Sequence, residues 1–551
     1  MAMAQQIMDN QTMSETQIGF FLFAPYVETV ELVGSWTEHS LVLKREDSGH
    51  WRLETALPDG RHNYRFRLRS LSPFMNGAVV EVTDPLARMV DEIQGDAGVI
   101  VIKDGLEVTT AFEWQHDGHL LPQDNQLMIY ELHVAEFGAT DGRLGTFNGV
   151  TDRLDYLRDL GVNAFEVMPV GAFPMDTSWG YNVRHACALE NAYGSPQDLK
   201  RLVDECHARG MRVILDLVLN HTESEAPLTK IDFYYWFRDA RDGELSFGPK
   251  LDYERLDDKL NVMPARKFGL EVALYWLREY HIDGYRLDAT AVLNNFDFVR
   301  ELRNACKGAA GGKPFYVIAE QLPEDPSIAT PEGPADGAWH LRFRDAVLEA
   351  LISNGDRLEF MAASLQPRNH GYLSPARVVN YVESHDEFTL MQRLAEAGIT
   401  GDAAFRKTKL AAGLLFTAVG NPMLHQAQEF GGFRPRDLEI RPVQWELLDA
   451  DYGLFLKEHH AWLARTRLDS PALTGEELEI LKADDGALVY TRGYGQAEVV
   501  IAVNLRDQDR SFDVPLPAGN WHELRFKTDL ESIGNFNDSF PASDLKIYVR
   551  R

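Results

Sequence analysis

The sequence predicts an α/β protein in which a (β/α)8 TIM barrel is flanked by N-terminal and C-terminal β-sandwich domains. Its 551 residues exceed one ordinary hydrophobic core, so we expect several domains. Residues 125–473 alternate apolar runs typical of buried strands with amphipathic runs typical of helices, eight times over. The regions on either side contain short strands and turns without long helical periods.

The N-terminal region divides into a predicted tail, residues 1–16, and a predicted β-sandwich, residues 17–115. Within the sandwich the strand-like runs include GFFLFAPYVETVELVGSW and HWRLETALPDGRHNYRFRL. Apolar and polar residues alternate along these runs, and Pro, Gly and Asp interrupt them, as is typical of antiparallel strands joined by turns.

The barrel is predicted over residues 125–473. Eight units favour a closed barrel, because an open doubly wound sheet usually has fewer repeats and a Gly-rich phosphate turn. Neither a GxGxxG nor a Walker sequence is present, so we expect no nucleotide requirement. The predicted strands are LMIYELHVAEF, VNAFEVMPV, RVILDLVLNH, DGYRLDA, PFYVIAEQ, a weak WHLRF, RVVNYVESHD and NPMLHQAQEF.

The sequence between these strands also predicts helices. SPQDLKRLVDECHARG ends in a Gly where a helix C-cap is expected, and FGLEVALYWLREYH has the apolar spacing of an amphipathic helix. Residues 474–551 return to short strands, among them EVVIAVNLR and LKIYVRR, and are predicted to form the second β-sandwich.

Composition excludes several classes of partner. The net charge is −29, from 55 basic and 84 acidic side chains, and such a surface repels nucleic acid and anionic lipid. No apolar run approaches the roughly 20 residues that span a bilayer. The first residues lack the pattern of a secretory signal, so a cytoplasmic location is expected. The cysteines, Cys187, Cys206 and Cys306, are far apart and indicate neither disulfides nor zinc.

Polar residues follow the predicted strands where a barrel carries its active site, at the C-terminal ends. One Asp or Glu at such a position is commonly structural, because it accepts hydrogen bonds from loop N–H groups. Four strand ends with polar residues together predict a site. The residues are Asp216, Asn220 and His221 on strand 3, Arg286 and Asp288 on strand 4, Glu320 on strand 5, and His385 and Asp386 on strand 7.

These motifs, DLVLNH, GYRLDA, VIAEQ and ESHDE, resemble in order and strand position those of the α-amylase superfamily, glycoside hydrolase family 13. The resemblance implies that Asp288 is the nucleophile of a covalent glycosyl-enzyme and Glu320 the acid that later becomes the base, with retention of anomeric configuration. Asp386 matches the third carboxylate, which binds sugar hydroxyls. Arg286 lies on the same face of its strand as Asp288, where its charge and hydrogen bonds can hold the nucleophile ionised.

The remaining site residues also follow from this resemblance. His221 and His385 match histidines that bind the sugar, Tyr181 in SWGYN matches the aromatic platform beneath it, and Trp179 of the same motif is a further substrate-binding candidate. In relatives Asp216 and Asn220 support the site or a calcium ion. Asn220 is therefore a weak metal candidate; no cofactor is predicted to be required, and Ca²⁺ stays open.

Different segments resemble different members of the superfamily. VELVGSW and the strands after it resemble the family 48 carbohydrate-binding module of branching and debranching enzymes; whether this sandwich binds glucan or only packs is left open. NAFEVMPVGAFPMDTSWGYN and AQEFG resemble branching enzymes, whereas LNHT is typical of hydrolases. VNYVESHDEFTL is similar to pullulanase and isoamylase, and DGYRLDAT to maltooligosyltrehalose trehalohydrolase.

From these resemblances we expect a retaining hydrolase of α-1,4 bonds in starch- or glycogen-type glucans or maltooligosaccharides. A glycogen-branching enzyme is the first alternative and an α-1,6 debranching enzyme the second. A noncatalytic glucan-binding protein is the alternative from another class, and the intact carboxylate set argues against it.

Overall fold

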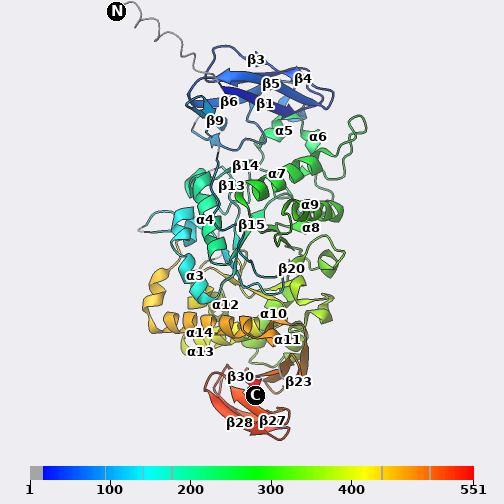
Figure 1. The fold of residues 1–551 in the computed structure, drawn as a ribbon. Coiled ribbons are helices and arrows are strands. Elements are labelled where there is room, and N and C mark those ends of the chain that lie inside the picture. The colour runs from blue at the N-terminus through cyan, green and yellow to red at the C-terminus, as the bar shows by residue number, and fades with distance from the viewer. Residues whose placement is uncertain are drawn as a thin grey trace, which may run out of the picture.

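The fold class is the predicted one, a parallel barrel between two β-rich ends (Figure 1). The computed structural model describes residues 16–93, 95–108, 110–140, 142–174, 178–435, 439–495 and 498–551. The predicted tail, residues 1–16, lies outside these ranges apart from its last residue. No helix in the described part of the chain is long and apolar enough to cross a membrane.

The barrel closes in chain order, so each predicted strand region contributes one barrel strand. These strands are short, and their side chains are buried on both faces, which explains why they appear in the sequence as continuous apolar runs. They are β11 (Ile129–Leu132), β12 (Ala164–Val167), β15 (Arg212–Leu217), β18 (Gly284–Leu287), β19 (Tyr316–Ala319), β20 (Gly337–Trp339), β21 (Val378–Asn380) and β22 (Asn421–His425).

The sixth strand is misplaced in the sequence prediction. Of the run WHLRF only Trp339 belongs to β20, and α10 (Leu341–Ile352) begins within the run. The strand has only three residues, Gly337–Trp339. Its apolar run is too short to be distinguished in the sequence from the helix that follows.

The predicted helices form with recognisable ends. Helix α4 (Pro196–Ala208) begins with a capping box between Ser195 and Asp198, and Gly210, at φ +69°, follows its C-terminal end as predicted. Helix α7 (Pro264–Tyr280) begins ahead of the predicted apolar pattern, because Pro264 supplies a favourable first position.

The N-terminal sandwich consists of a sheet containing β1 (Thr16–Phe23) and β5 (His50–Leu57) and a second sheet around β6 (Gly60–Arg69). It rests on the segment that follows β15, which contains α6 (Phe233–Trp236). The Phe23 ring lies 5.9 Å from that of Trp236. This segment therefore joins the sandwich to the barrel.

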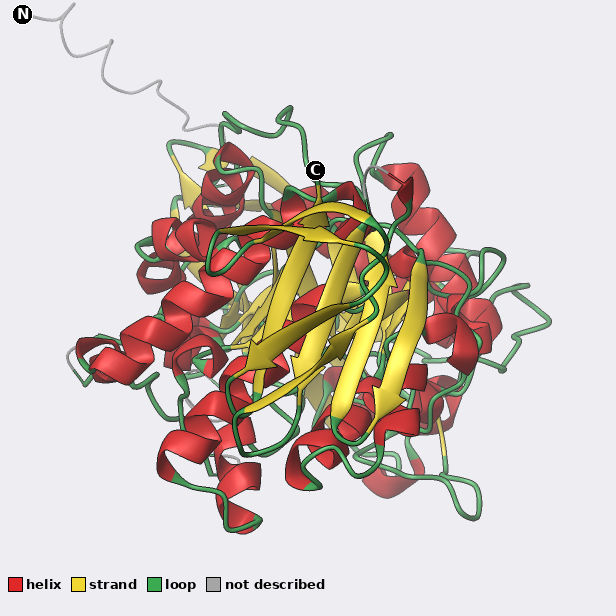
Figure 2. Ribbon diagram, turned by 90° about the horizontal axis from the view of Figure 1, so that it is seen from below, coloured by secondary structure: helices red, strands yellow, loops and turns green. Residues whose placement is uncertain are grey.

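The C-terminal sandwich pairs a sheet containing β25 (Val499–Asn504) and β30 (Asp544–Arg550) with the two-stranded sheet β26 (Arg510–Val514) and β29 (Phe536–Phe540). In Figure 2 its strands lie in front of the barrel and its ring of helices. Lys409 of α13 (Gly401–Thr417) forms an ion pair with Asp544 (2.9 Å), which ties this sandwich to a barrel helix.

Candidate active site

One buried guanidinium group organises the site. Arg286 Nη1 donates to both oxygens of Asp216 (2.9 and 2.8 Å) and to Asp288 Oδ1 (2.8 Å). Arg286 Nη2 donates to Glu320 Oε2 (2.8 Å). The register of the sheet explains this meeting, because Asp216 and Arg286 are direct partners on the adjacent parallel strands β15 and β18. Three neighbouring strands thus present carboxyl groups to one cation.

Asp288 is held from two sides. Besides the bond from Arg286 to Oδ1, Asn220 Nδ2 donates to Oδ2 (2.6 Å). Asn220 Oδ1 in turn lies 2.6 Å from His221 Nδ1. These contacts fix the orientation of the predicted nucleophile and place His221 beside it.

Glu320 has the environment of a general acid. Its Oε2 atom accepts hydrogen bonds from Arg286 and from the Ala289 N–H (2.8 Å). Burial raises the pKa of Glu320 to about 7; Arg286 opposes this rise, while the charges of Asp288 and Asp386 add to it. Near neutral pH a substantial fraction of Glu320 is therefore protonated and able to give its proton to a leaving group.

Asp386 is the most exposed of the three predicted catalytic carboxylates, with 41% of its side chain accessible. Its Oδ2 atom lies 3.3 Å from His385 Nε2 and 3.9 Å from Arg286 Nη2. Burial lowers the pKa of His385, but the charges of Asp386 and Glu131 more than offset this and raise it to about 9. A cationic imidazole therefore lies beside a carboxylate that is open to a ligand.

The predicted aromatic residues complete the cluster. The Tyr181 hydroxyl donates to Asp216 Oδ2 (2.5 Å), and the Tyr181 ring stacks on His385 with centroids 5.0 Å apart. Trp179 meets His385 edge-on at 5.4 Å. The structure therefore brings all the sequence-predicted site residues into one group.

Two buried glutamates of this group are missing from the sequence prediction. Glu131 on β11 accepts from the His385 backbone N–H (3.0 Å) and contacts His385 Nδ1 through Oε1 (2.6 Å). Glu166, its partner on β12, is buried, and neither of its oxygens has a hydrogen-bond partner in the described part of the chain. Burial, with the charge of Glu131, raises the pKa of Glu166 well above its ordinary value. The sequence signal that could have identified them is an acidic residue inside an apolar strand, as in YELH and AFEVM.

The site offers little for a metal ion. Among the residues that the structure describes, no group of three or more His, Cys, Asp or Glu side chains is arranged to hold one. Both side-chain amide atoms of Asn220 already have protein partners. Calcium binding stays open, as in the sequence analysis.

Comparison with known proteins agrees with this geometry. The alpha-amylase catalytic domain model matches residues 132–246. Over this segment the chain is therefore similar to the catalytic domain of α-amylases. The matched segment covers Asp216 and His221 but ends before Asp288, Glu320 and Asp386.

The proteins that this chain is similar to differ in their named activities. The chain is 28% identical to malto-oligosyltrehalose trehalohydrolase of Saccharolobus solfataricus over 77% of this chain and 75% of that one. It is 25% identical to the 1,4-alpha-glucan branching enzyme of Cellvibrio japonicus over 94% of this chain and 75% of that one. The pullulanase of Bacillus subtilis in complex with maltose has the same fold, with a TM-score of 0.83, 21% identity and coverage of 98% of this chain and 84% of that one.

Proposed function

We propose that this protein is a retaining glycoside hydrolase that cleaves α-1,4-glucosidic bonds in starch- or glycogen-type glucans or maltooligosaccharides. The observation that carries the proposal is the binding of Asp288 and Glu320 to one guanidinium group, with the pKa of Glu320 raised to about 7. Carboxyl groups held by the two nitrogens of one Arg are close neighbours, as the roughly 5–5.5 Å spacing of a retaining pair requires.

The proposed reaction has two steps. The Asp288 carboxylate attacks C1 while Glu320 gives its proton to the leaving oxygen, so one C–O bond breaks and a glycosyl ester forms. Glu320, now ionised, takes a proton from a water molecule whose oxygen attacks C1 and releases Asp288. Asp386 and His385 hold the hydroxyl groups of the sugar during both steps.

Transfer is the alternative that a specific observation favours. The branching enzyme of Cellvibrio japonicus aligns over 94% of this chain, a longer stretch than the trehalohydrolase. If a sugar hydroxyl rather than water attacks the glycosyl ester, the same carboxylates form an α-1,6 branch. Cleavage of α-1,6 bonds, or debranching, is the third alternative, because some of the similar proteins are named pullulanases.

A proton NMR time course with amylose separates these reactions. Hydrolysis predicts reducing ends that increase without new α-1,6 signals, whereas branching predicts α-1,6 signals at nearly constant reducing ends. If neither changes, pullulan tests debranching. We expect Asp288→Asn and Glu320→Gln to lower kcat by at least about 10²–10⁴-fold while glucan binding survives, because each removes a reacting group. Near-normal turnover in either variant would contradict the assignment.

A cytoplasmic location remains part of this proposal. Cys187, Cys206 and Cys306 are buried free thiols, and such residues persist in a reducing compartment.

A further inference from the structure

The guanidinium group of Arg286 has to lie in one orientation for the site to form. Its Nη1 atom donates to Asp288 Oδ1 and its Nη2 atom to Glu320 Oε2, both at 2.8 Å. Because the guanidinium donors lie in one plane, tilting that plane lengthens one or both of these bonds. Arg286 Nε has no hydrogen-bond partner in the described part of the chain. That edge of the group is therefore held by packing and not by a hydrogen bond.

Trp339, the last residue of β20, packs against this group. The guanidinium carbon of Arg286 lies 4.6 Å from the centre of the Trp339 ring and 5.6 Å from that of Tyr181. Both distances are within the roughly 6 Å at which a cation is attracted to an aromatic face, and the attraction is strongest for indole in a buried setting. Arg286 is 0% exposed and Trp339 is 1% exposed. The pair therefore meets the conditions under which this attraction is large.

The interior of the barrel holds Trp339 in place. Val379 is its partner on the neighbouring strand β21, and the ring of Tyr381 lies 5.2 Å away. These residues belong to one cluster of buried side chains, which also includes Ile214 and Ile318. The indole N–H has no hydrogen-bond partner in the described structure, although a buried tryptophan usually has one. The described contacts of Trp339 are therefore contacts of its ring, with the cation and with its neighbours in the cluster.

The orientation of Arg286 affects both reacting groups at once. Its positive charge opposes the effect of burial on the pKa of Glu320, and its Nη1 atom bonds the predicted nucleophile, Asp288. A tilt of the guanidinium group would therefore change the charge of the acid and the alignment of the nucleophile together.

We propose that Trp339 is a positioning residue of the proposed reaction, whose indole face sets the orientation of the Arg286 guanidinium toward Asp288 and Glu320. The inference rests on the proposed function for the roles of these two carboxyl groups. Trp339 is nearly inaccessible to solvent, so it acts through Arg286 and not by contact with the sugar. A purely structural role would require only that the indole fill space in the barrel.

An NMR titration of Glu320 separates these two roles. In protein carrying isotopically labelled glutamate, the Glu320 signal is the one that Glu320→Gln removes, and its midpoint in the parent should lie at about pH 7. Trp339→Met fills part of the space without an aromatic face. Its Glu320 midpoint should lie higher by about 0.5 pH unit or more, because Arg286 then stabilises the ionised carboxylate less. Trp339→Phe keeps an aromatic face and should stay closer to the parent.

The same variants should differ in turnover. We expect Trp339→Met to lower kcat about tenfold or more, because the reacting groups lose their alignment, and to leave KM within about twofold of the parent. The alkaline limb of kcat/KM should move upward with the Glu320 midpoint. Trp339→Phe should recover most of the lost kcat.

Leu127→Ala is the matched control, because it opens a cavity in the same cluster by truncating a side chain that has neither a charge nor an aromatic face. Its Glu320 midpoint should equal that of the parent. Equal shifts in Leu127→Ala and Trp339→Met, or a shift in neither, would overturn the proposal. A Trp339→Phe variant that shifts as far as Trp339→Met would also overturn it.

Fluorinated tryptophan provides a second test that holds even if Trp339→Met does not fold. Fluorine weakens the attraction of the ring for a cation at nearly constant volume, so its incorporation should raise the Glu320 midpoint in the parent but not in Trp339→Phe. No shift in the parent, or an equal shift in both proteins, would contradict the role of Trp339. The titration needs no substrate, so a parent that cleaves no α-glucan would refute the proposed function and leave this test decisive.

Discussion

Glu320 shares the guanidinium group of Arg286 with Asp216, Asp288 and Asp386, so its proton affinity depends on its charged neighbours. Its pKa is raised to about 7, mainly by burial. In the proposed reaction the protonated form gives its proton to the leaving group, so kcat/KM should fall as the pH increases through about 7. A pH profile of kcat/KM with a maltooligosaccharide substrate measures this limb. A profile that stays flat from pH 6 to pH 9 would remove Glu320 from the role of acid.

Glu131 is expected to act as a positioning residue through His385. Its charge helps to raise the pKa of His385 to about 9, and its two oxygens fix both the ring and the backbone of that residue. In Glu131→Gln the pKa of His385 should therefore fall, and substrate affinity at pH 8 should weaken by about tenfold through loss of one charged hydrogen bond. NMR titration of the histidine ring and a comparison of KM with kcat provide the measurements.

Glu166→Gln is the matched control for that experiment. Burial and the charge of Glu131 raise the pKa of Glu166 well above its ordinary value, which favours the neutral form of its side chain. Neither oxygen of Glu166 bonds to His385, so we expect a smaller shift of the His385 titration in this variant than in Glu131→Gln. Equal shifts in the two variants would mean that packing rather than charge controls His385.

At the scale of elements, the segment after β15 ties the N-terminal sandwich to the barrel through Asp257. Its carboxylate accepts hydrogen bonds from the hydroxyls of Tyr26 (2.9 Å) and Tyr235 (2.8 Å) and from the Lys259 N–H (3.0 Å). Asp257→Ala leaves these donors without a partner, so it should lower the free energy of unfolding by about 1–3 kcal/mol and reduce hydrogen-exchange protection in β1. Tyr26→Phe, which removes only one hydroxyl, should have a smaller effect; equal exchange in both variants would contradict this contact.

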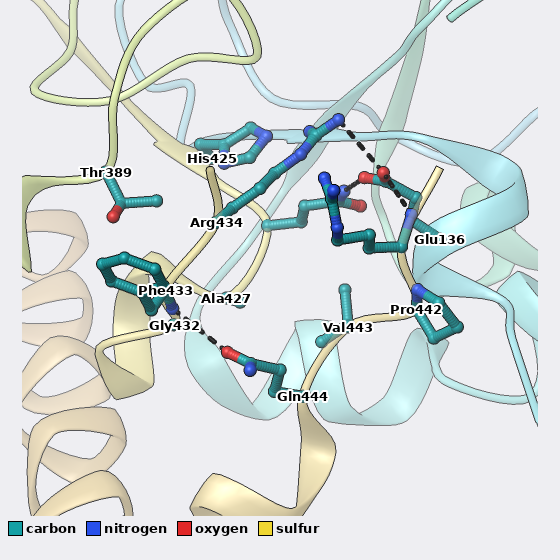
Figure 3. Close-up of a pocket in the computed structure, with 12 residues that line it drawn as sticks. Glu136, Thr389, His425, Ala427, Gly432, Phe433, Arg434, Pro442, Val443 and Gln444 are labelled. Atoms are coloured by element: carbon teal, nitrogen blue, oxygen red, sulfur yellow. Dashed lines mark hydrogen bonds and ion pairs between the residues drawn. The ribbon is translucent and has the colours of Figure 1, made fainter. Parts of the chain in front are cut away.

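The elements also show which parts of the fold a sequence can reveal. Barrel strands such as β15 and β22 are buried on both faces, so their apolar runs mark them clearly. β20 has only three residues and is followed almost directly by α10, so its position could not be identified from the sequence. Residues at the ends of strands, such as Asp288 and Glu320, could be predicted because strand order brings strand ends together. The contact between Arg434 and Glu136 (Figure 3) could not be predicted, since it depends on how the loop after β22 meets helix α1 (Val134–Phe137), which is distant in sequence.

At the scale of the whole molecule, buried ionisable groups should limit stability at both ends of the pH range. Burial lowers the pKa values of His133, His340 and His425 to about 3, so stability is lost as the pH falls below about 6.5, where the unfolded histidines take up protons. Burial raises the pKa of Glu429 to about 7 and that of Glu383 to about 8. Their stabilising contribution is present below about pH 4.5 and is lost as the pH increases through 7 to 8.

Glu383→Gln tests the predicted loss of stability at alkaline pH. The amide still accepts the hydrogen bond from the Leu390 N–H (2.7 Å) but cannot ionise, so the decrease in Tm between pH 6.5 and 8.5 should become shallower than in the parent. Glu359→Gln removes one charge from an exposed position and controls for the net charge of −29, whose self-repulsion also grows with pH. Scanning calorimetry across this range provides the test. If the curve for Glu383→Gln runs parallel to those of the parent and Glu359→Gln, the buried carboxyl does not control alkaline stability.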